Sequence, residues 1–327
     1  MPLHPWKFAV LLAAALSLAA CRSDAGTEAE GASAAPSAQV IDQAPVEPIV
    51  TREGDVVHIE LTAQVTNVEI AEDEYYRAWT FNGTVPGPVL RVREGDTIQL
   101  TLRNLDPNMP HSMDLHAVQA SPSGKFVDIM PDEQGTFTYT ADSPGVFMYH
   151  CGTKPVLLHI GNGMYGMIIV EPKNGYSTDA GVDREYMLVQ SEWYADNSID
   201  AMLHGESKYV VFNGNDYALN EQPLLAKVGD RIRLYVVNAG PNEVSSFHVV
   251  GAIFDRVYES GNPANVQRGI QTTLIPAGGG SVVEFTVQEA GDYPIVSHQF
   301  DQATKGAVAT LRVTEDGRDN GEPAMGH

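Results

Sequence analysis

An internal repeat constrains this chain of 327 residues more than any other feature of its sequence. Landmarks of the first half return in the same order in the second half. The pairs are Phe81-Asn82-Gly83 with Phe212-Asn213-Gly214, Gly95-Asp96 with Gly229-Asp230, Asp114-Leu115-His116-Ala117-Val118 with Ser246-Phe247-His248-Val249-Val250, and Pro144-Gly145-Val146-Phe147 with Ala290-Gly291-Asp292-Tyr293. We therefore expect two domains of similar plan that follow each other along the chain.

Short runs rich in Val, Ile, Thr, Tyr and Phe predict strands throughout both halves. The clearest runs are residues 56–61, 97–102, 136–140, 167–170, 231–237 and 281–287. Ile98, Leu100 and Leu102 alternate with polar residues, which is the period of a strand with one buried face. Only residues 201–204 and part of 263–269 indicate helix. The pattern predicts an all-β fold made of two β-sandwiches.

The N-terminus carries a predicted export signal. Lys7 precedes an apolar run over residues 8–20 that is too short to span a bilayer but fits the core of a secretory signal. We assign residues 1–20 to a signal peptide. Its end, Leu18-Ala19-Ala20-Cys21, resembles the lipobox of bacterial lipoproteins, in which the cysteine is lipidated. The resemblance implies an extracytoplasmic protein anchored through Cys21 to a membrane, in the periplasm or at the outer membrane.

Changes in composition set the remaining boundaries. Residues 21–48 are rich in Ala, Ser, Gly, Glu and Pro and predict a flexible tether. The strand pattern stops between residues 172 and 183, where Lys, Asn, Gly, Ser and Thr replace it. We therefore expect a first domain over residues 49–172, a second over residues 173–316, and a tail over residues 317–327.

The net charge of the chain limits the classes of molecule that can be its partners. Twenty Lys and Arg stand against 42 Asp and Glu, a formal net charge of −22. So acidic a surface repels the phosphates of nucleic acids and of anionic lipids. We expect no nucleic-acid partner, a membrane association only through the N-terminal lipid, and a basic surface on any protein partner.

The second cysteine, Cys151, stands among potential metal ligands. It precedes His159 and Met164 in one short loop, and His111 lies beside a repeated landmark earlier in the same domain. A thiolate, two imidazoles and a weak axial thioether make the ligand set of a blue-copper electron-transfer site. We predict that His111, Cys151, His159 and Met164 bind one copper ion.

A second site follows from the residue next to Cys151. Adjacent residues on a strand point to opposite faces, so His150 and Cys151 serve two different metals joined by one peptide. His116 is placed to join His150, and His298 is the natural third ligand. Three nitrogen ligands with an open position are typical of a catalytic metal site.

Four segments together resemble the two-domain copper nitrite reductases. They are Met109-Pro110-His111-Ser112-Met113-Asp114-Leu115-His116, the stretch from Tyr149-His150-Cys151 through His159 to Met164, Ser246-Phe247-His248-Val249-Val250, and Val296-Ser297-His298. The resemblance implies two tandem cupredoxin domains, each a Greek-key β-sandwich, in a homotrimer. It also implies type 1 copper on His111, Cys151, His159 and Met164 and type 2 copper on His116, His150 and His298, two coppers per subunit.

The same resemblance implies the reaction, the dissimilatory reduction of nitrite to nitric oxide and water. Asp114 and His248 stand at the positions that handle protons, and Val250 stands at a pocket position that is commonly Ile. The spacing from Cys151 to His159 is the family's shorter form, like that of lipid-anchored outer-membrane members. No Cys-x-x-Cys-His haem motif is present, so we expect a separate electron donor such as a cytochrome c or a small cupredoxin.

The repeat predicts how the second site is assembled. His116 and His248 occupy corresponding places in their own domains, so each domain presents half of a site on an equivalent face. Two domains in series cannot readily bring both faces together, but domain one of one subunit can meet domain two of the next. Such a head-to-tail contact closes into a ring or continues as a filament. With the family resemblance, this predicts a ring of three in which His298 comes from the neighbouring subunit.

Two other functions use the same kind of domain. A multicopper oxidase with a trinuclear cluster needs eight histidines, mostly in His-x-His pairs, and the chain has no such pair. A cupredoxin-type electron carrier would account for the first site alone. It would leave His116, Asp114, His248 and His298 without a role, which favours the reductase.

Overall fold

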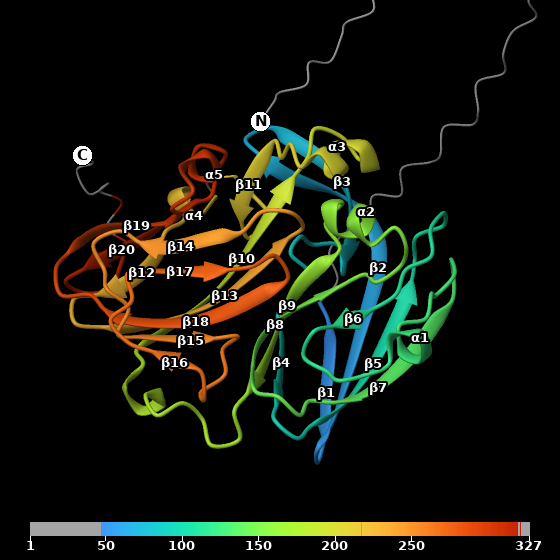
Figure 1. The fold of residues 1–327 in the computed structure, drawn as a ribbon, viewed down its shortest axis with the longest axis horizontal. Coiled ribbons are helices and arrows are strands. Elements are labelled where there is room, and N and C mark those ends of the chain that lie inside the picture. The colour runs from blue at the N-terminus through green and yellow to red at the C-terminus, as the bar shows by residue number, and fades with distance from the viewer. Residues whose placement is uncertain (1–46, 217, 320, 322–327) are drawn as a thin grey trace, which may run out of the picture. The chain divides into compact units, whose positions relative to one another are not determined.

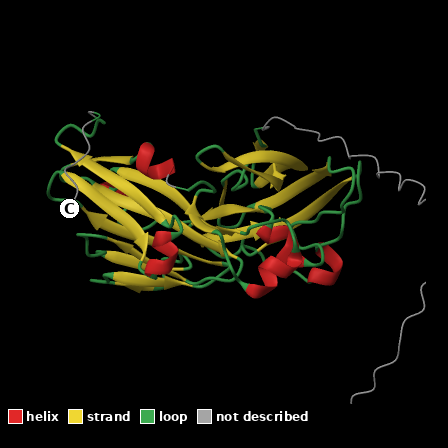
Figure 2. Cartoon of the chain, turned by 90° about the horizontal axis from the view of Figure 1, so that it is seen from above, coloured by secondary structure: helices red, strands yellow, loops and turns green. Residues whose placement is uncertain are grey.

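The computed structural model describes residues 47–216, 218–319 and 321. Regular structure in this part of the chain is mostly β-strand, and the helices are short (Figure 2). The predicted signal peptide, Cys21 and nearly all of the predicted tether lie outside the described residues, as does much of the predicted tail. None of the described helices has the length and apolar character needed to cross a membrane.

Strands from the first half of the chain form two sheets that enclose one hydrophobic core (Figure 1). The first sheet contains β1 (Ile49–Glu53), β2 (Val56–Ala71), β5 (Thr97–Asn104) and β7 (Gln134–Thr140) in that order, with β3 (Glu74–Phe81) also paired to β2. The second contains β4 (Leu90–Arg93), β9 (Tyr165–Glu171), β8 (Gly145–His150) and β6 (Asp114–Leu115). This pair of sheets is the first sandwich.

Strands from the second half repeat this arrangement around a core of their own. One sheet contains β11 (Tyr209–Phe212), β10 (Arg184–Trp193), β13 (Arg231–Gly240), β18 (Gly279–Thr286), β15 (Arg256–Glu259) and β16 (Val266–Gln267). The other contains β12 (Leu224–Lys227), β20 (Val308–Thr314), β19 (Gly291–Ser297), β14 (Ser245–Val249) and β17 (Thr272–Ile275). The all-β prediction is confirmed, and the boundary between residues 172 and 173 stays a prediction.

Burial explains the strand patterns. Along β5 the residues of one face, Ile98, Leu100, Leu102 and Asn104, are buried, and those of the other face are partly or fully exposed. This confirms the predicted strand with one buried face. In contrast, β8 and β9 are buried almost throughout. One face of these two strands packs in the first core, and the other contributes Met148, Met167 and Ile169 to a cluster with residues of β13 and β18. The end of β8 is therefore fixed from both sides.

The repeated Phe-Asn-Gly landmark is a turn that needs its asparagine and glycine. Asn82 and Asn213 have φ angles of 59° and 54°, and the glycines that follow have φ angles of 80° and 83°. Asparagine and glycine adopt this left-handed conformation more readily than other residues. Each asparagine Oδ1 accepts a 2.8 Å hydrogen bond from a strand amide, that of Thr62 or Val189. The sequence repeat is thus a repeat of local geometry.

The helices bear out one sequence prediction and overturn another. Helix α3 (Ile199–His204) contains the predicted residues 201–204. The predicted helix within residues 263–269 is wrong, because Val266 and Gln267 form β16 and pair with Tyr258 and Val257 of β15. The sequence pattern did not indicate α1 (Pro122–Lys125), α2 (Val156–Gly161), the 3-10 helix η1 (Asp179–Gly181), α4 (Ala218–Glu221) or α5 (Phe300–Thr304).

Candidate metal centres

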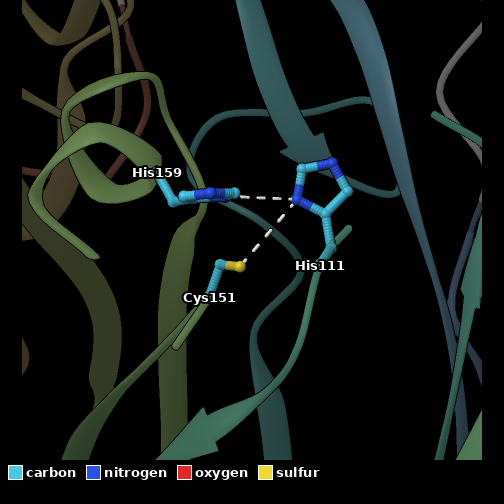
Figure 3. Close-up of side chains that lie close together, drawn as sticks. All are labelled: His111, Cys151 and His159. Atoms are coloured by element: carbon cyan, nitrogen blue, oxygen red, sulfur yellow. Dashed lines mark hydrogen bonds between the residues drawn. The ribbon is translucent and has the colours of Figure 1, made fainter. Parts of the chain in front are cut away.

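The structure brings His111, Cys151 and His159 together in the first sandwich (Figure 3). Cys151 follows the last residue of β8, His159 lies in α2, and His111 lies in the segment between β5 and β6. The Nδ1 atoms of the two histidines are 3.2 Å apart, and Cys151 Sγ is 3.8 Å from His111 Nδ1. All three side chains are fully buried. Three soft or borderline donors therefore converge on one point without access to bulk water.

Met164, the fourth predicted ligand, closes the loop that holds this cluster. Its carbonyl accepts a hydrogen bond from the amide of Cys151, and its amide donates to the carbonyl of His159. Its side chain is fully buried. Helix α2 occupies the middle of the loop between Cys151 and Met164, so a helical turn, rather than an irregular loop, positions His159.

Electrostatics favour the thiolate form of Cys151. Burial alone raises the pKa of a thiol, but His111 and His159 outweigh this effect and hold the pKa of Cys151 well below its usual value. The amide of Ser112 also points at Cys151 Sγ, 3.3 Å away. The deprotonated sulfur is the form that binds metals.

A second cluster contains Asp114, His116 and His150. The Nε2 atoms of His116 and His150 are 3.0 Å apart, and Asp114 Oδ2 is 3.8 Å from His150 Nε2. Asp114 pairs with His150 between β6 and β8. His116 is exposed and Asp114 is half-buried, so this cluster opens to solvent whereas the first does not.

The proton positions in the second cluster follow from its hydrogen bonds. His116 Nδ1 lies 3.0 Å from the carbonyl oxygen of Gly278, and His150 Nδ1 lies 2.8 Å from that of Cys151. A carbonyl oxygen only accepts, so both Nδ1 atoms carry hydrogen and both Nε2 atoms keep a free lone pair. Desolvation of the imidazole, together with the nearby His150, lowers the pKa of His116. Two lone pairs facing each other at 3.0 Å fit a bound cation between them.

The two clusters meet at one peptide bond. His150 turns toward His116, and its neighbour Cys151 turns toward His111. The predicted separation of these adjacent residues between two sites therefore matches the geometry of the strand end. The covalent path from one cluster to the other is a single dipeptide.

The remaining predicted site residues lie in the second sandwich. The rings of His248 and His298 are 5.5 Å apart, and neither residue belongs to the second cluster of this chain. The backbone around them corresponds to that of the first sandwich. The amide of His298 donates to the carbonyl of Ser246, and in the first sandwich His150 pairs with Asp114 in the same way. Val250 follows the end of β14 and is exposed. The structure thus holds two corresponding pairs of histidines in separate places.

Sequence reasoning missed the groups that orient these donors. Asp106 contacts the outer nitrogen of His111, and Gly278 contacts the outer nitrogen of His116. Gly278 belongs to the other sandwich and is separated from His116 by 162 positions, so no local pattern indicates the contact. Asp106 is five residues before His111, a spacing that has no general meaning in a loop.

Comparisons with known proteins agree with the donor chemistry. Two family models described as multicopper oxidase match residues 62–175 and 192–317. A copper-containing nitrite reductase of Neisseria meningitidis serogroup A is 39% identical over 280 residues, which is 81% of this chain and 71% of the relative. One of Neisseria gonorrhoeae is 37% identical, covering 96% of this chain and 88% of the relative.

Solved structures give the same result. The copper nitrite reductase from Nitrosomonas europaea superposes with a TM-score of 0.75 at 44% identity, over 81% of this chain and 98% of that one. A laccase from Botrytis aclada has a TM-score of 0.67 at 18% identity, over 83% of this chain and 55% of that one, and shares the fold alone. The family models and the nitrite reductase structure confirm the two tandem cupredoxin domains predicted from the sequence.

Gly278 offers a test of the contact on His116. Gly278 has a φ of +77°, and an added Cβ would lie 3.2 Å from His116 Cε1. Gly278→Ala should displace the carbonyl or the ring and weaken metal binding at the second cluster about 10- to 100-fold, the usual effect of losing an outer partner. Copper retained after dialysis against a graded chelator measures the loss, and the first cluster should keep its metal.

Gly54→Ala is the matched control, because Gly54 has a φ of +62° with nothing near its added Cβ. Both variants carry a left-handed backbone cost of roughly 1–2 kcal/mol. An equal loss of metal in both variants, or none in Gly278→Ala, would show that the contact does not orient His116.

Proposed function

The chain belongs to the copper-containing nitrite reductases, and on that premise we propose that it reduces nitrite with two coppers of different type held by the two clusters. The reaction adds one electron and two protons to nitrite and releases nitric oxide and water. The observation that carries the proposal is the pair of donor clusters joined by the His150–Cys151 peptide. One cluster contains a thiolate and is closed to solvent, and the other has no thiolate and is open to solvent. Copper, when bound, supplies one-electron redox chemistry at the first cluster and a Lewis acid at the second.

We assign type 1 copper to His111, Cys151, His159 and Met164. The thiolate and two imidazole nitrogens are the donors that select this kind of copper site, and their burial excludes water. Because Cys151 is bonded directly to His150, the electron has a short covalent path to the open cluster. Backbone hydrogen bonds of Met164 and of α2 hold the loop that carries these ligands.

We assign type 2 copper to His116 and His150 of one subunit and His298 of its neighbour. The facing lone pairs of His116 and His150 supply two nitrogens, and a third must come from elsewhere. His298 sits beside His248 on a face of the second sandwich that carries exposed apolar side chains. These are Val250 (44% exposed), Leu274 (70%) and Phe300 (62%).

Exposed apolar groups of this size around two histidines support a protein contact there. The contact we propose is with the His116 face of another copy, in a homotrimer. Val250 would then border the nitrite pocket. A head-to-tail contact of this kind is satisfied in all copies only when the ring closes.

We propose that Asp114 and His248 supply the protons. Asp114 lies 3.8 Å from His150 Nε2 and remains partly open to solvent, so it can exchange protons with water. His248 Nδ1 points at the carbonyl of Gln271, 2.6 Å away, which leaves Nε2 free. A carboxylate and an imidazole beside the proposed type 2 site would fit general acid catalysis.

The net charge and the N-terminal segment support proposals about the electron donor and the location of the enzyme. The net charge of −22 favours a basic electron donor, such as a cytochrome c or a small cupredoxin. The lipobox-like segment favours a lipid on Cys21 and a site of action outside the cytoplasm, in the periplasm or at the outer membrane. Mass spectrometry of the mature N-terminus checks the lipid.

Removal of the thiolate tests the division between the two clusters. Cys151→Ala should abolish the visible absorption and donor-driven turnover while the copper of the second cluster stays bound. Metal analysis, absorption and electron paramagnetic resonance spectra measure this. His58→Ala, a substitution in β2 outside both clusters, should change none of them. A coloured Cys151→Ala protein would contradict the type 1 assignment.

Asp114→Asn and His248→Ala test proton supply. Each should keep both coppers and slow turnover about 10²- to 10⁴-fold, the usual range for general acid catalysis. Nitric oxide release under steady-state conditions, with copper content measured on the same samples, gives the comparison. Full activity in either variant would remove that residue from the mechanism.

Mixed subunits test the shared site. His116→Ala and His298→Ala should each be inactive alone, but co-expression should restore part of the activity, because one interface then contains an intact His116 and an intact His298. Co-expression of His116→Ala with His150→Ala is the matched control. Both defects lie in the same half-site, so no mixture restores a complete one. If the first pair stays inactive although differently tagged chains assemble together, the site is not shared between subunits.

A further inference from the structure

Asp106 is a buried carboxylate beside a predicted copper ligand, and the proposed mechanism does not use it. It lies in the turn after β5 and is 1% exposed. Its Oδ2 is 3.1 Å from His111 Nε2, and its Oδ1 accepts a 2.8 Å hydrogen bond from the amide of Asn108. One oxygen therefore serves the turn and the other serves the imidazole.

The contact decides which nitrogen of His111 carries hydrogen. A carboxylate only accepts, so Nε2 is protonated and Nδ1 keeps its lone pair. Nδ1 is the atom that faces His159 Nδ1 and Cys151 Sγ. His159 differs: its Nε2 is buried and has no hydrogen-bond partner among the described residues. The two imidazoles of this cluster are thus chemically unequal, and only one is backed by a negative charge.

The corresponding turn of the second sandwich keeps the same asparagine hydrogen bonds without a carboxylate. Asp106 donates its amide to Asn104 Oδ1 at 2.9 Å, and Gly240 donates its amide to Asn238 Oδ1 at 3.1 Å. Each asparagine also bonds through Nδ2 to two backbone carbonyls. The second turn has this frame with a glycine in place of Asp106, and the described part of the second sandwich holds no thiolate cluster.

We propose that Asp106 is a positioning residue that holds His111 in its metal-binding tautomer and, as a buried anion, lowers the reduction potential of the type 1 copper. The proposal rests on the type 1 assignment made above. A negative charge behind the imidazole strengthens its donation and favours the oxidised, more positive state of the metal. A lower potential makes onward transfer of the electron to the second cluster more favourable.

The test is Asp106→Asn in the copper-loaded protein. Asn Oδ1 can still accept from Asn108, but its amide group faces His111 Nε2 with hydrogens instead of a charge. We expect the preference for oxidised copper to fall about 10-fold or more, which for a one-electron couple raises the potential by about 59 mV per factor of ten. A redox titration that follows the visible absorption measures the potential.

Asp128→Asn is the matched control. Asp128 accepts a hydrogen bond from Thr153 in the same region, but it is exposed and touches none of the predicted ligands. Asp128→Asn removes the same charge as Asp106→Asn and should leave the reduction potential of the type 1 copper unchanged. If Asp106→Asn does not fold, Asp106→Ser, whose hydroxyl can still accept in the turn, carries the same expectation.

The outcomes separate the two proposals. A raised potential in the Asp106 variant alone supports the inference. An unchanged potential, or equal shifts in the Asp106 and Asp128 variants, overturns it while the type 1 assignment stands. A wild-type protein without the type 1 absorption overturns the assignment itself.

Discussion

The peptide bond between His150 and Cys151 is the constraint on which both clusters depend. Neighbouring residues at the end of a strand point in opposite directions, so one side chain joins His116 and the other joins His111. This geometry is useful only if the strand end cannot move. Packing on both faces of β8, with the first core on one side and residues of β13 and β18 on the other, provides that rigidity.

Hydrogen-bond acceptors behind the imidazoles fix which ring nitrogen carries hydrogen and which is free to bind a metal. Asp106, the carbonyl of Gly278 and the carbonyl of Cys151 each accept from the outer nitrogen of one histidine. Each leaves a lone pair that points into a cluster. Facing lone pairs are unfavourable by themselves, so the fold holds an arrangement that a cation relieves. The acceptor behind His111 is a carboxylate, whereas those behind His116 and His150 are neutral carbonyls, so the two clusters differ in charge.

The two sandwiches share a frame but differ in what they carry. Both use the Phe-Asn-Gly turn and an asparagine that ties a loop to two carbonyls, and both end a buried strand beside a pair of histidines. Only the first holds a thiolate cluster among the described residues. In the second, the corresponding interior holds a polar network in which Gln302 bonds to Ser297 and Gln190. The duplicated frame thus carries a pair of histidines in each sandwich and a thiolate cluster in the first.

The sequence alone determined the features that depend on local spacing. Strand positions follow from alternation, the two-sandwich plan follows from the repeat, and the gathering of Cys151, His159 and Met164 follows because they share one loop. Only the tertiary structure decided the rest. Helix α2 forms in a segment with no amphipathic pattern, and residues 266–267 pair as a strand because the preceding turn folds back on β15. The contacts of Gly278 with His116 and of Asp106 with His111 fix proton positions through three-dimensional approach, and a single sequence has no periodicity that records such contacts.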